Sequence, residues 1–126
     1  MMDAERLIAE KSILERNLPS NCYRFLDMDT NSPYIVLAAK TDHGNLYTLR
    51  IDLDFYPENR PNMYVVNKLD VDSNKTFLNS NLPIQTIECE KGLMLSNYIG
   101  SWSSMISLYN VYYRGKMWLE MFENQK

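Results

Sequence analysis

The chain has 126 residues, which is room for one domain built around a single hydrophobic core. Its apolar fraction of 45% and charged fraction of 23% exclude the disordered, collagen-like and disulfide-stapled classes. The 13 Lys and Arg residues against 16 Asp and Glu residues give a net charge of −3, which argues against nucleic acid or an anionic membrane as a partner. We therefore expect a protein or a small molecule as the partner.

The cysteine and histidine content bears on compartment and cofactors. Two cysteines, Cys22 and Cys89, are too few for a stapled secreted domain, and the first residues have neither the basic region nor the apolar stretch of a signal peptide. These features favour a cytoplasmic protein. With His43 as the single histidine and no paired Cys and His spacing, we expect no metal site and no cofactor.

Residues 92–113 carry no charged side chain, and this stretch is long enough in principle to cross a bilayer. Serine and asparagine residues interrupt it throughout, and their burial in lipid would be unfavourable. We therefore expect no membrane span.

The first half of the chain predicts a helix followed by strands. Residues 4–16 are expected to form a helix that Asp3 caps and that ends before Pro19. Strands are predicted at residues 22–28, 34–40 and 46–55, with a hairpin turn at 42–45. The last of these strands alternates apolar and polar residues, so we expect Phe55 to face the core and Asp52 to face solvent.

The second half predicts one more strand and a second helix. After a loop made rigid by Pro57 and Pro61, a fourth strand is predicted at residues 62–69, followed by a polar, irregular stretch at 70–86. A helix is expected from residue 103 onward, with Glu120 and Glu123 exposed and Gly115 weakening its middle. This order predicts an α+β fold with a four-stranded antiparallel meander packed on helices. No glycine-rich phosphate loop points to a nucleotide-binding sheet.

Several of these segments carry a family resemblance. The N-terminal helix contains Arg6 and Glu10, residues 56–61 read Tyr-Pro-Glu-Asn-Arg-Pro, and Trp102 introduces the last helix about forty residues later. Together with the Trp-Leu-Glu-Met-Phe-Glu ending at 118–123, these features resemble the ubiquitin-conjugating enzyme (UBC-like) fold over nearly the whole chain. The resemblance implies a single UBC-like domain, residues 1–126, with an irregular active-site-like region before the C-terminal helix. RWD domains share the Tyr-Pro-x-x-x-Pro spacing and keep the fold without conjugation chemistry.

The residues that carry catalysis in active members of this family are missing. There the nucleophilic cysteine follows a glycine and precedes a leucine, roughly eight residues before the tryptophan. Here Met94 occupies that place, or Leu95 if the register slips by one, and neither can form a thioester. The family's His-Pro-Asn triplet, whose Asn is taken to stabilise the oxyanion, is also absent from residues 81–84. The resemblance therefore implies a degenerate site near Met94.

Two further sets of residues leave alternatives open. Cys89 lies between Glu88 and Glu90, whose charges disfavour a thiolate, so we expect an ordinary thiol; the alternative is a displaced nucleophile. The candidate binding residues are in the loop that lies near the ligase-binding surface in the family, and at the start of the last helix: Tyr56, Pro57, Pro61 and Trp102. The alternatives are a rigid corner that packs Tyr56 onto the meander, and a core role for Trp102.

The sequence thus predicts a non-catalytic UBC-like binding module in a ubiquitin-like protein conjugation system. Its partner would be a ubiquitin-like protein, a conjugating or activating enzyme, or another protein. One alternative is a conjugating enzyme that uses Cys89, or one whose natural cysteine at position 94 or 95 has been replaced. The other alternative is an RWD-like protein-interaction scaffold.

Overall fold

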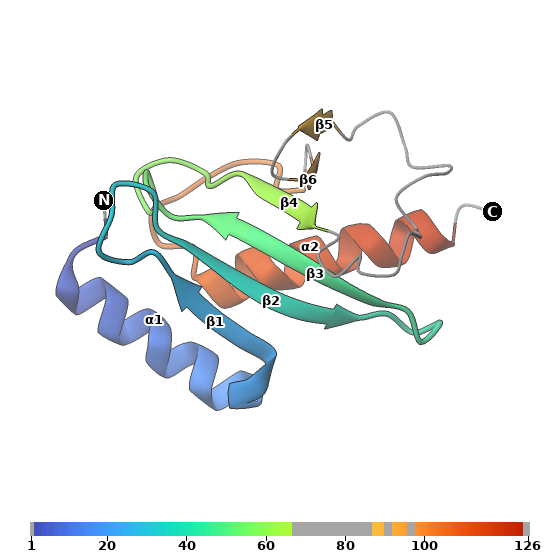
Figure 1. Cartoon of the computed structure of the whole chain (residues 1–126), viewed down its shortest axis with the longest axis horizontal. Coiled ribbons are helices and arrows are strands. Elements are labelled where there is room, and N and C mark those ends of the chain that lie inside the picture. Colours follow the sequence, from blue (N-terminus) through green and yellow to red (C-terminus); the bar gives the residue numbers. More distant parts are fainter. Residues whose placement is uncertain (1, 67–86, 90–91, 96–97, 125–126) are drawn as a thin grey trace.

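Figure 1 shows the computed structural model of the chain, which describes residues 2–66, 87–89, 92–95 and 98–124. Its elements in chain order are α1 (Ala4–Asn17), the 3-10 helix η1 (Ser20–Cys22), β1 (Tyr23–Leu26), β2 (Tyr34–Lys40), β3 (Leu46–Asp52), β4 (Met63–Val66), β5 (Ile87–Cys89), β6 (Gly92–Leu95) and α2 (Leu108–Glu123). The described strands form one antiparallel sheet in the order β1-β2-β3-β4-β6-β5. The predicted α+β class, with a helix at each end, is confirmed.

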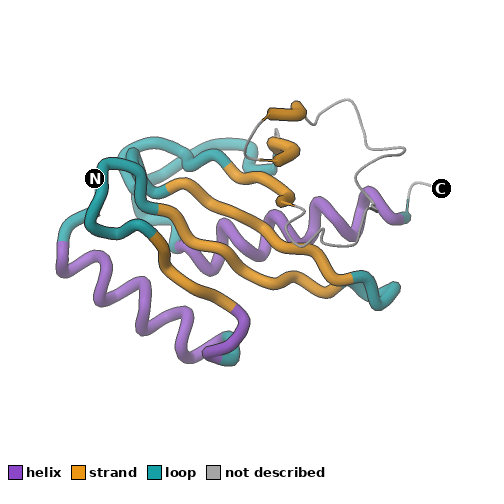
Figure 2. Tube along the Cα trace, viewed as in Figure 1, coloured by secondary structure: helices purple, strands orange, loops and turns teal. Residues whose placement is uncertain are grey.

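The predicted meander is also confirmed, because β1 to β4 lie side by side in chain order (Figure 2). β2 and β3 are joined by the expected hairpin, in which the Thr41 amide donates to the Asn45 carbonyl over 2.9 Å. Gly44 adopts a φ of 87°, a left-handed conformation that glycine takes without steric cost. β3 ends at Asp52, earlier than predicted, because the chain turns there and the Tyr56 amide donates back to the Leu53 carbonyl.

The prediction of an irregular region before the last helix is wrong for residues 87–89 and 92–95. These residues form β5 and β6, which pair with each other, and β6 also pairs with β4. Strands of three and four residues are too short to show an alternating pattern, and their pairing depends on a strand far away in the sequence. The stretch at 70–86 lies outside the described residues.

Both helices begin at side-chain caps. As predicted, Asp3 accepts a hydrogen bond from the Arg6 amide at the start of α1. α2 begins at Leu108 rather than at residue 103, because Ser107 accepts from the Asn110 amide and is the cap. The residues before it form a separate turn closed by a bond from the Ile106 amide to the Ser103 carbonyl.

The core lies between the sheet and the helices, with α2 behind the sheet in Figure 1. Its largest fully buried aliphatic members are Leu14, Ile35, Leu37, Leu49, Ile51, Leu53, Leu108, Val111 and Leu119. Gly115, which was expected to weaken α2, is a close-approach position. A Cβ atom there would clash with the Met63 sulfur, so the glycine lets α2 pack tightly on β4.

The opposite side of the sheet, called the outer face below, carries one residue from each of five strands in direct register: Arg24, Val36, Arg50, Tyr64 and Met94. Asp52 was expected to be solvated but is buried, and Arg50 Nε donates to its Oδ1 over 3.0 Å. Phe55 was expected in the core but is 64% exposed, because the alternation stops where β3 ends.

No helix within the described ranges is both long and apolar enough to span a bilayer. The uncharged stretch at 92–113 is instead divided between elements of different kinds. It supplies β6, the segment 98–107 that carries Trp102, and the first residues of α2.

Candidate functional site

The position that the family resemblance gives to the nucleophile lies on β6. Met94 is half-buried and pairs with Tyr64 of β4 on one side and with Ile87 of β5 on the other. Leu95, the alternative register, is buried in the core beside Met63. A thioether and an aliphatic side chain have no proton to lose and cannot carry an acyl group, so neither position offers thioester chemistry.

Cys89 ends β5, where its backbone pairs with that of Gly92. Its side chain lies outside the described part of the structure, and so do residues 81–84. The choice between an ordinary thiol and a displaced nucleophile therefore stays a prediction. Cys22, the other cysteine, is half-buried and unpaired with any sulfur among the described residues.

The structure brings three of the four candidate binding residues into contact at one corner of the molecule. Trp102 Nε1 donates to the Pro57 carbonyl over 2.8 Å, and the rings of Trp102 and Tyr56 meet edge to face with centroids 5.9 Å apart. The Tyr56–Pro57 peptide bond is cis. We call these three residues the aromatic corner.

Pro61 joins the same region through its backbone. Tyr98 donates its hydroxyl hydrogen to the Pro61 carbonyl, and Arg60 Nη1 donates to the Ile99 carbonyl over 3.4 Å. The Arg60 guanidinium also lies over the Tyr98 ring, 5.6 Å from its centre. Residues 56–61 and 98–106 are thus held together along their length, as a rigid-corner interpretation of the loop requires.

A charged network centred on the buried Glu10 of α1, which the sequence did not reveal, supports the aromatic corner. Arg6 Nη2 donates to the Tyr56 hydroxyl over 2.9 Å, and that hydroxyl donates to the Ile106 carbonyl over 2.7 Å. Arg6 Nε donates to Glu10 over 2.7 Å, and the other Glu10 oxygen accepts from the Leu108 amide over 2.8 Å. Burial raises the pKa of Tyr56 above its ordinary value, and the Glu10 charge adds to this. The hydroxyl therefore stays protonated and can donate. The sequence signal that could have indicated this network is the i, i+4 spacing of Arg6 and Glu10, which places an opposite-charge pair on one face of a helix.

The four candidate binding residues differ in their exposure to solvent. Tyr56 and Pro61 are buried, whereas Pro57 and Trp102 are half-buried. Next to them in sequence are two large apolar side chains in solvent, Phe55 at 64% exposure and Met105 at 84%. The solvent-facing part of this region therefore consists of these two exposed side chains and the exposed parts of Pro57 and Trp102.

A second polar cluster, which we call the hairpin clasp, joins the β2–β3 turn to the end of α2. Glu123 Oε2 accepts from Asn45 Nδ2 and from the Tyr47 hydroxyl, each over 2.7 Å, and its Oε1 lies 3.0 Å from His43 Nδ1. Both Glu120 oxygens accept from the Asp42 amide. The expectation that the two glutamates are exposed is wrong, because the hairpin folds over the helix and covers them.

The clasp changes the titration of its members. Burial opposes ionisation of Glu123, but hydrogen bonds led by those from Asn45, Thr41 and Tyr47 hold the pKa of Glu123 below its ordinary value of 4.5. Burial and the bond to Glu123 raise the pKa of Tyr47. No group of three or more His, Cys, Asp or Glu residues suited to a metal occurs in the described part of the chain.

Comparison with protein-family models, with curated proteins and with solved structures found no match for this chain.

Proposed function

We propose that this chain is a non-catalytic UBC-like binding module in a ubiquitin-like protein conjugation system. The observation that carries the proposal is Met94, which lies on β6 at the position where the family resemblance requires a cysteine. Thioester transfer needs a thiolate, and a methionine removes that step while leaving the surrounding sheet intact.

The element order supports the same proposal. An N-terminal helix, a four-stranded meander, a Tyr-Pro corner, a tryptophan and a C-terminal helix follow one another as the resemblance implies. The hydrogen bonds around Tyr56 and Trp102 fix the corner without any contribution from the degenerate site. A chain that has lost catalysis but keeps this corner is suited to binding.

The proposed binding surface is the aromatic corner with its two exposed neighbours, Phe55 and Met105. Large apolar side chains in solvent beside a rigid support are typical of protein interfaces. The partner would be a ubiquitin-like protein or the conjugating enzyme that carries it.

A charging assay tests the loss of catalysis. The protein and its Cys89→Ser variant are each incubated with ATP, the cognate activating enzyme and the cognate ubiquitin-like protein. We expect no adduct that a reductant removes. An adduct on the wild type that disappears in Cys89→Ser would show a true conjugating enzyme and overturn the proposal.

A binding assay tests the surface. Co-elution of the protein with the ubiquitin-like protein or its conjugating enzyme should be lost in Phe55→Glu. The matched control is Met121→Glu, because Phe55 and Met121 are both 64% exposed and Met121 lies near the far end of α2. Equal loss in both variants would exclude the corner as the binding surface.

The RWD-like scaffold remains the second candidate because the Tyr-Pro-x-x-x-Pro corner is common to both families. The two candidates differ in what a tagged copy recovers from its native cell. Recovery of structural-complex subunits, with no ubiquitin-like protein and no conjugating or activating enzyme, would favour the scaffold.

A further inference from the structure

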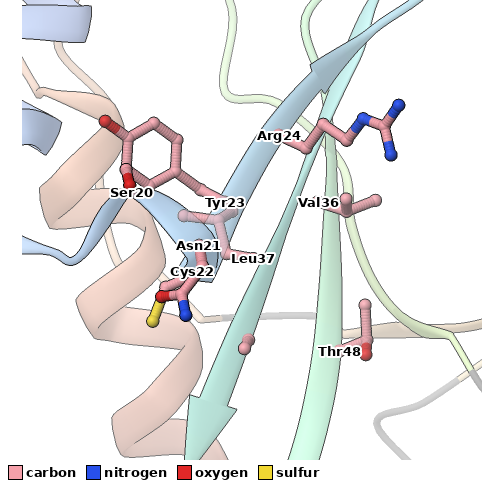
Figure 3. A pocket seen from close by; sticks show the side chains of 9 residues that line it. Ser20, Asn21, Cys22, Tyr23, Arg24, Val36, Leu37 and Thr48 are labelled. Carbon is pink, nitrogen blue, oxygen red and sulfur yellow. The ribbon is translucent and has the colours of Figure 1, made fainter.

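The outer face of the sheet contains a hollow of about 470 Å³ beside β1, shown in Figure 3. Residues of η1, β1, β2 and β3 line it, and among them Arg24, Val36 and Thr48 project from the same side of the sheet. Its volume falls within the range of ligand-binding pockets. The hollow shares no residue with the aromatic corner or with Met94.

The register of the sheet explains why the hollow exists. Across the outer face, Val36 has Arg24 of β1 beside it and Arg50 of β3 on its other side. Ala38, two residues further along β2, has Thr48 on one side but no β1 neighbour, because the pairing of β1 with β2 begins at Tyr23 and Leu37. A small side chain next to a missing neighbour leaves a space in the outer layer.

The charge of the lining indicates what the hollow would bind. Among the described residues that line the hollow, Arg24 is the only charged one and none carries a carboxylate. No ion pair joins Arg24 to any residue in the described ranges, whereas Arg50, two strands away on the same face, is already bonded to Asp52. The site therefore combines an apolar floor at Val36 and Ala38 with an unneutralised guanidinium at its rim.

The shape favours a protein segment over a small metabolite. Pockets for small molecules enclose most of the ligand surface, and this hollow is open to solvent along the sheet. Side chains two residues apart on an extended strand lie about 7 Å apart, which is also the spacing of Val36 and Ala38 along β2. An extended segment can therefore fill the space on Ala38 with one side chain and reach Arg24 with the side chain two residues away.

We propose that this hollow binds an extended acidic segment of a partner protein, in which an apolar side chain packs on Ala38 and a carboxylate two residues away pairs with Arg24. The ion pair fixes the register of the segment and the apolar side chain supplies buried area. The site is independent of the conjugation role, because it uses neither the aromatic corner nor the degenerate site.

Selection of a random-peptide phage library on the full chain tests this site. We expect the selected peptides to share an apolar residue two positions from Asp or Glu. Their affinity, measured by fluorescence anisotropy, should fall roughly tenfold in Arg24→Glu and in Ala38→Phe, which fills the hollow. A selection without this motif, or peptides that bind both variants as well as the wild type, would overturn the proposal.

Two controls separate recognition from non-specific attraction. Arg114→Glu makes the same charge change on an exposed residue of α2, and it should leave peptide binding unchanged. A selected peptide whose acid is replaced by Lys should bind Arg24→Glu better than it binds the wild type. If Arg114→Glu weakened peptide binding as much as Arg24→Glu does, the effect would come from net charge alone, and the proposed site would be contradicted. Because Arg24 is exposed, its variant keeps the test valid even if Ala38→Phe does not fold.

Discussion

The two ends of α2 are both held by glutamates, but the carboxylates approach from different directions. At the N-terminal end the carboxylate belongs to α1, where Glu10 accepts from the Leu108 amide. The Leu108 amide lies in the first turn of α2, where backbone N–H groups have no carbonyl acceptor within the helix. The helix dipole also favours a negative charge at this end. The same carboxylate also binds Arg6, which in turn reaches Tyr56. The contacts at this end thus form one connected chain from the Leu108 amide to Tyr56.

At the C-terminal end the carboxylates belong to α2 itself. Glu120 and Glu123 lie in its last turns, where the helix dipole disfavours negative charge. Donors from the hairpin offset this cost, with Asn45, Tyr47 and the Asp42 amide each bonding to one of the two carboxylates. The stability that the clasp contributes therefore depends on the hydrogen bonds between its carboxylates and the hairpin donors.

This difference in carboxylate placement predicts that the two ends of α2 contribute unequally to the free energy of unfolding. Glu10 is only 3% exposed and pairs with the half-buried Arg6, so removing it leaves that guanidinium without its carboxylate. The clasp is shared among several donors, and one of them, His43, is more than half exposed. We expect the N-terminal network to dominate stability and the clasp to respond to pH.

The largest expected effect is that of Glu10→Ala. Removing this carboxylate leaves the Arg6 guanidinium and the Leu108 amide without their buried acceptor, and we expect a loss of about 3–5 kcal/mol in the free energy of unfolding. Urea denaturation followed by circular dichroism measures this loss.

A matched control lies on the same helix. Glu15 is exposed, and Glu15→Ala should change stability by less than about 0.5 kcal/mol. If Glu10→Ala and Glu15→Ala gave equal losses, the buried network would contribute nothing and the comparison between the two ends of α2 would fail.

The next effect concerns the hydroxyl that links α1 to the aromatic corner. Tyr56→Phe removes one acceptor from Arg6 and the donor to the Ile106 carbonyl, but Arg6 itself also donates to that carbonyl over 3.1 Å. Because part of the bonding survives, we expect a loss of about 2 kcal/mol in urea denaturation. Tyr113→Phe, on the exposed side of α2, should leave the midpoint unchanged. A midpoint for Tyr56→Phe equal to that of the wild type would contradict a role for the hydroxyl.

A smaller and pH-dependent effect is expected at the clasp. The pKa of Glu123 in the folded protein lies below its ordinary value of 4.5, so the unfolded chain takes up this proton first as the pH falls. The stability that the carboxylate contributes is therefore complete above that value and is lost as the pH falls through the folded-state pKa. Glu123→Gln should cost about 1 kcal/mol at neutral pH. In urea denaturation at acidic pH the cost of this substitution should become smaller. A cost that stays constant with pH would contradict a lowered pKa of Glu123 in the folded protein.

Much of the fold follows from local patterns in the sequence. The Asp3 cap, the alternation that starts at Leu46 and the Gly44 turn correctly predict α1, the start of β3 and the hairpin, because each depends on neighbours in the chain. β5 and β6 were missed because tertiary pairing holds them, β6 on β4 and β5 on β6, rather than a pattern of their own. The exposed Phe55 was missed because alternation gives no signal for where a strand ends.

The candidate sites also show that features which depend on residues distant in the sequence are not predicted from local patterns. The aromatic corner could be anticipated, since its residues stand out as Tyr, Pro and Trp at a recognisable spacing. The burial of Glu10 could not, because its partner Leu108 is 98 positions away and charged residues are usually assigned to solvent. The outer-face hollow was also invisible, because it results from the residue at which β1 begins to pair with β2. Sequence reveals which side chains are available, whereas tertiary pairing decides which of them are covered.

The smallest expected effect tests whether the clasp depends on its exposed member. His43 Nδ1 lies 3.0 Å from Glu123 Oε1, but the His43 side chain is 54% exposed, and polar contacts of exposed side chains contribute little to stability. The other Glu123 oxygen keeps its bonds to Asn45 and Tyr47 when the imidazole is removed. His43→Ala should therefore lower the free energy of unfolding by less than about 0.5 kcal/mol at neutral pH. A loss as large as that of Glu123→Gln would mean that the imidazole organises the other donors, and the clasp would then depend on a single contact as the N-terminal end depends on Glu10.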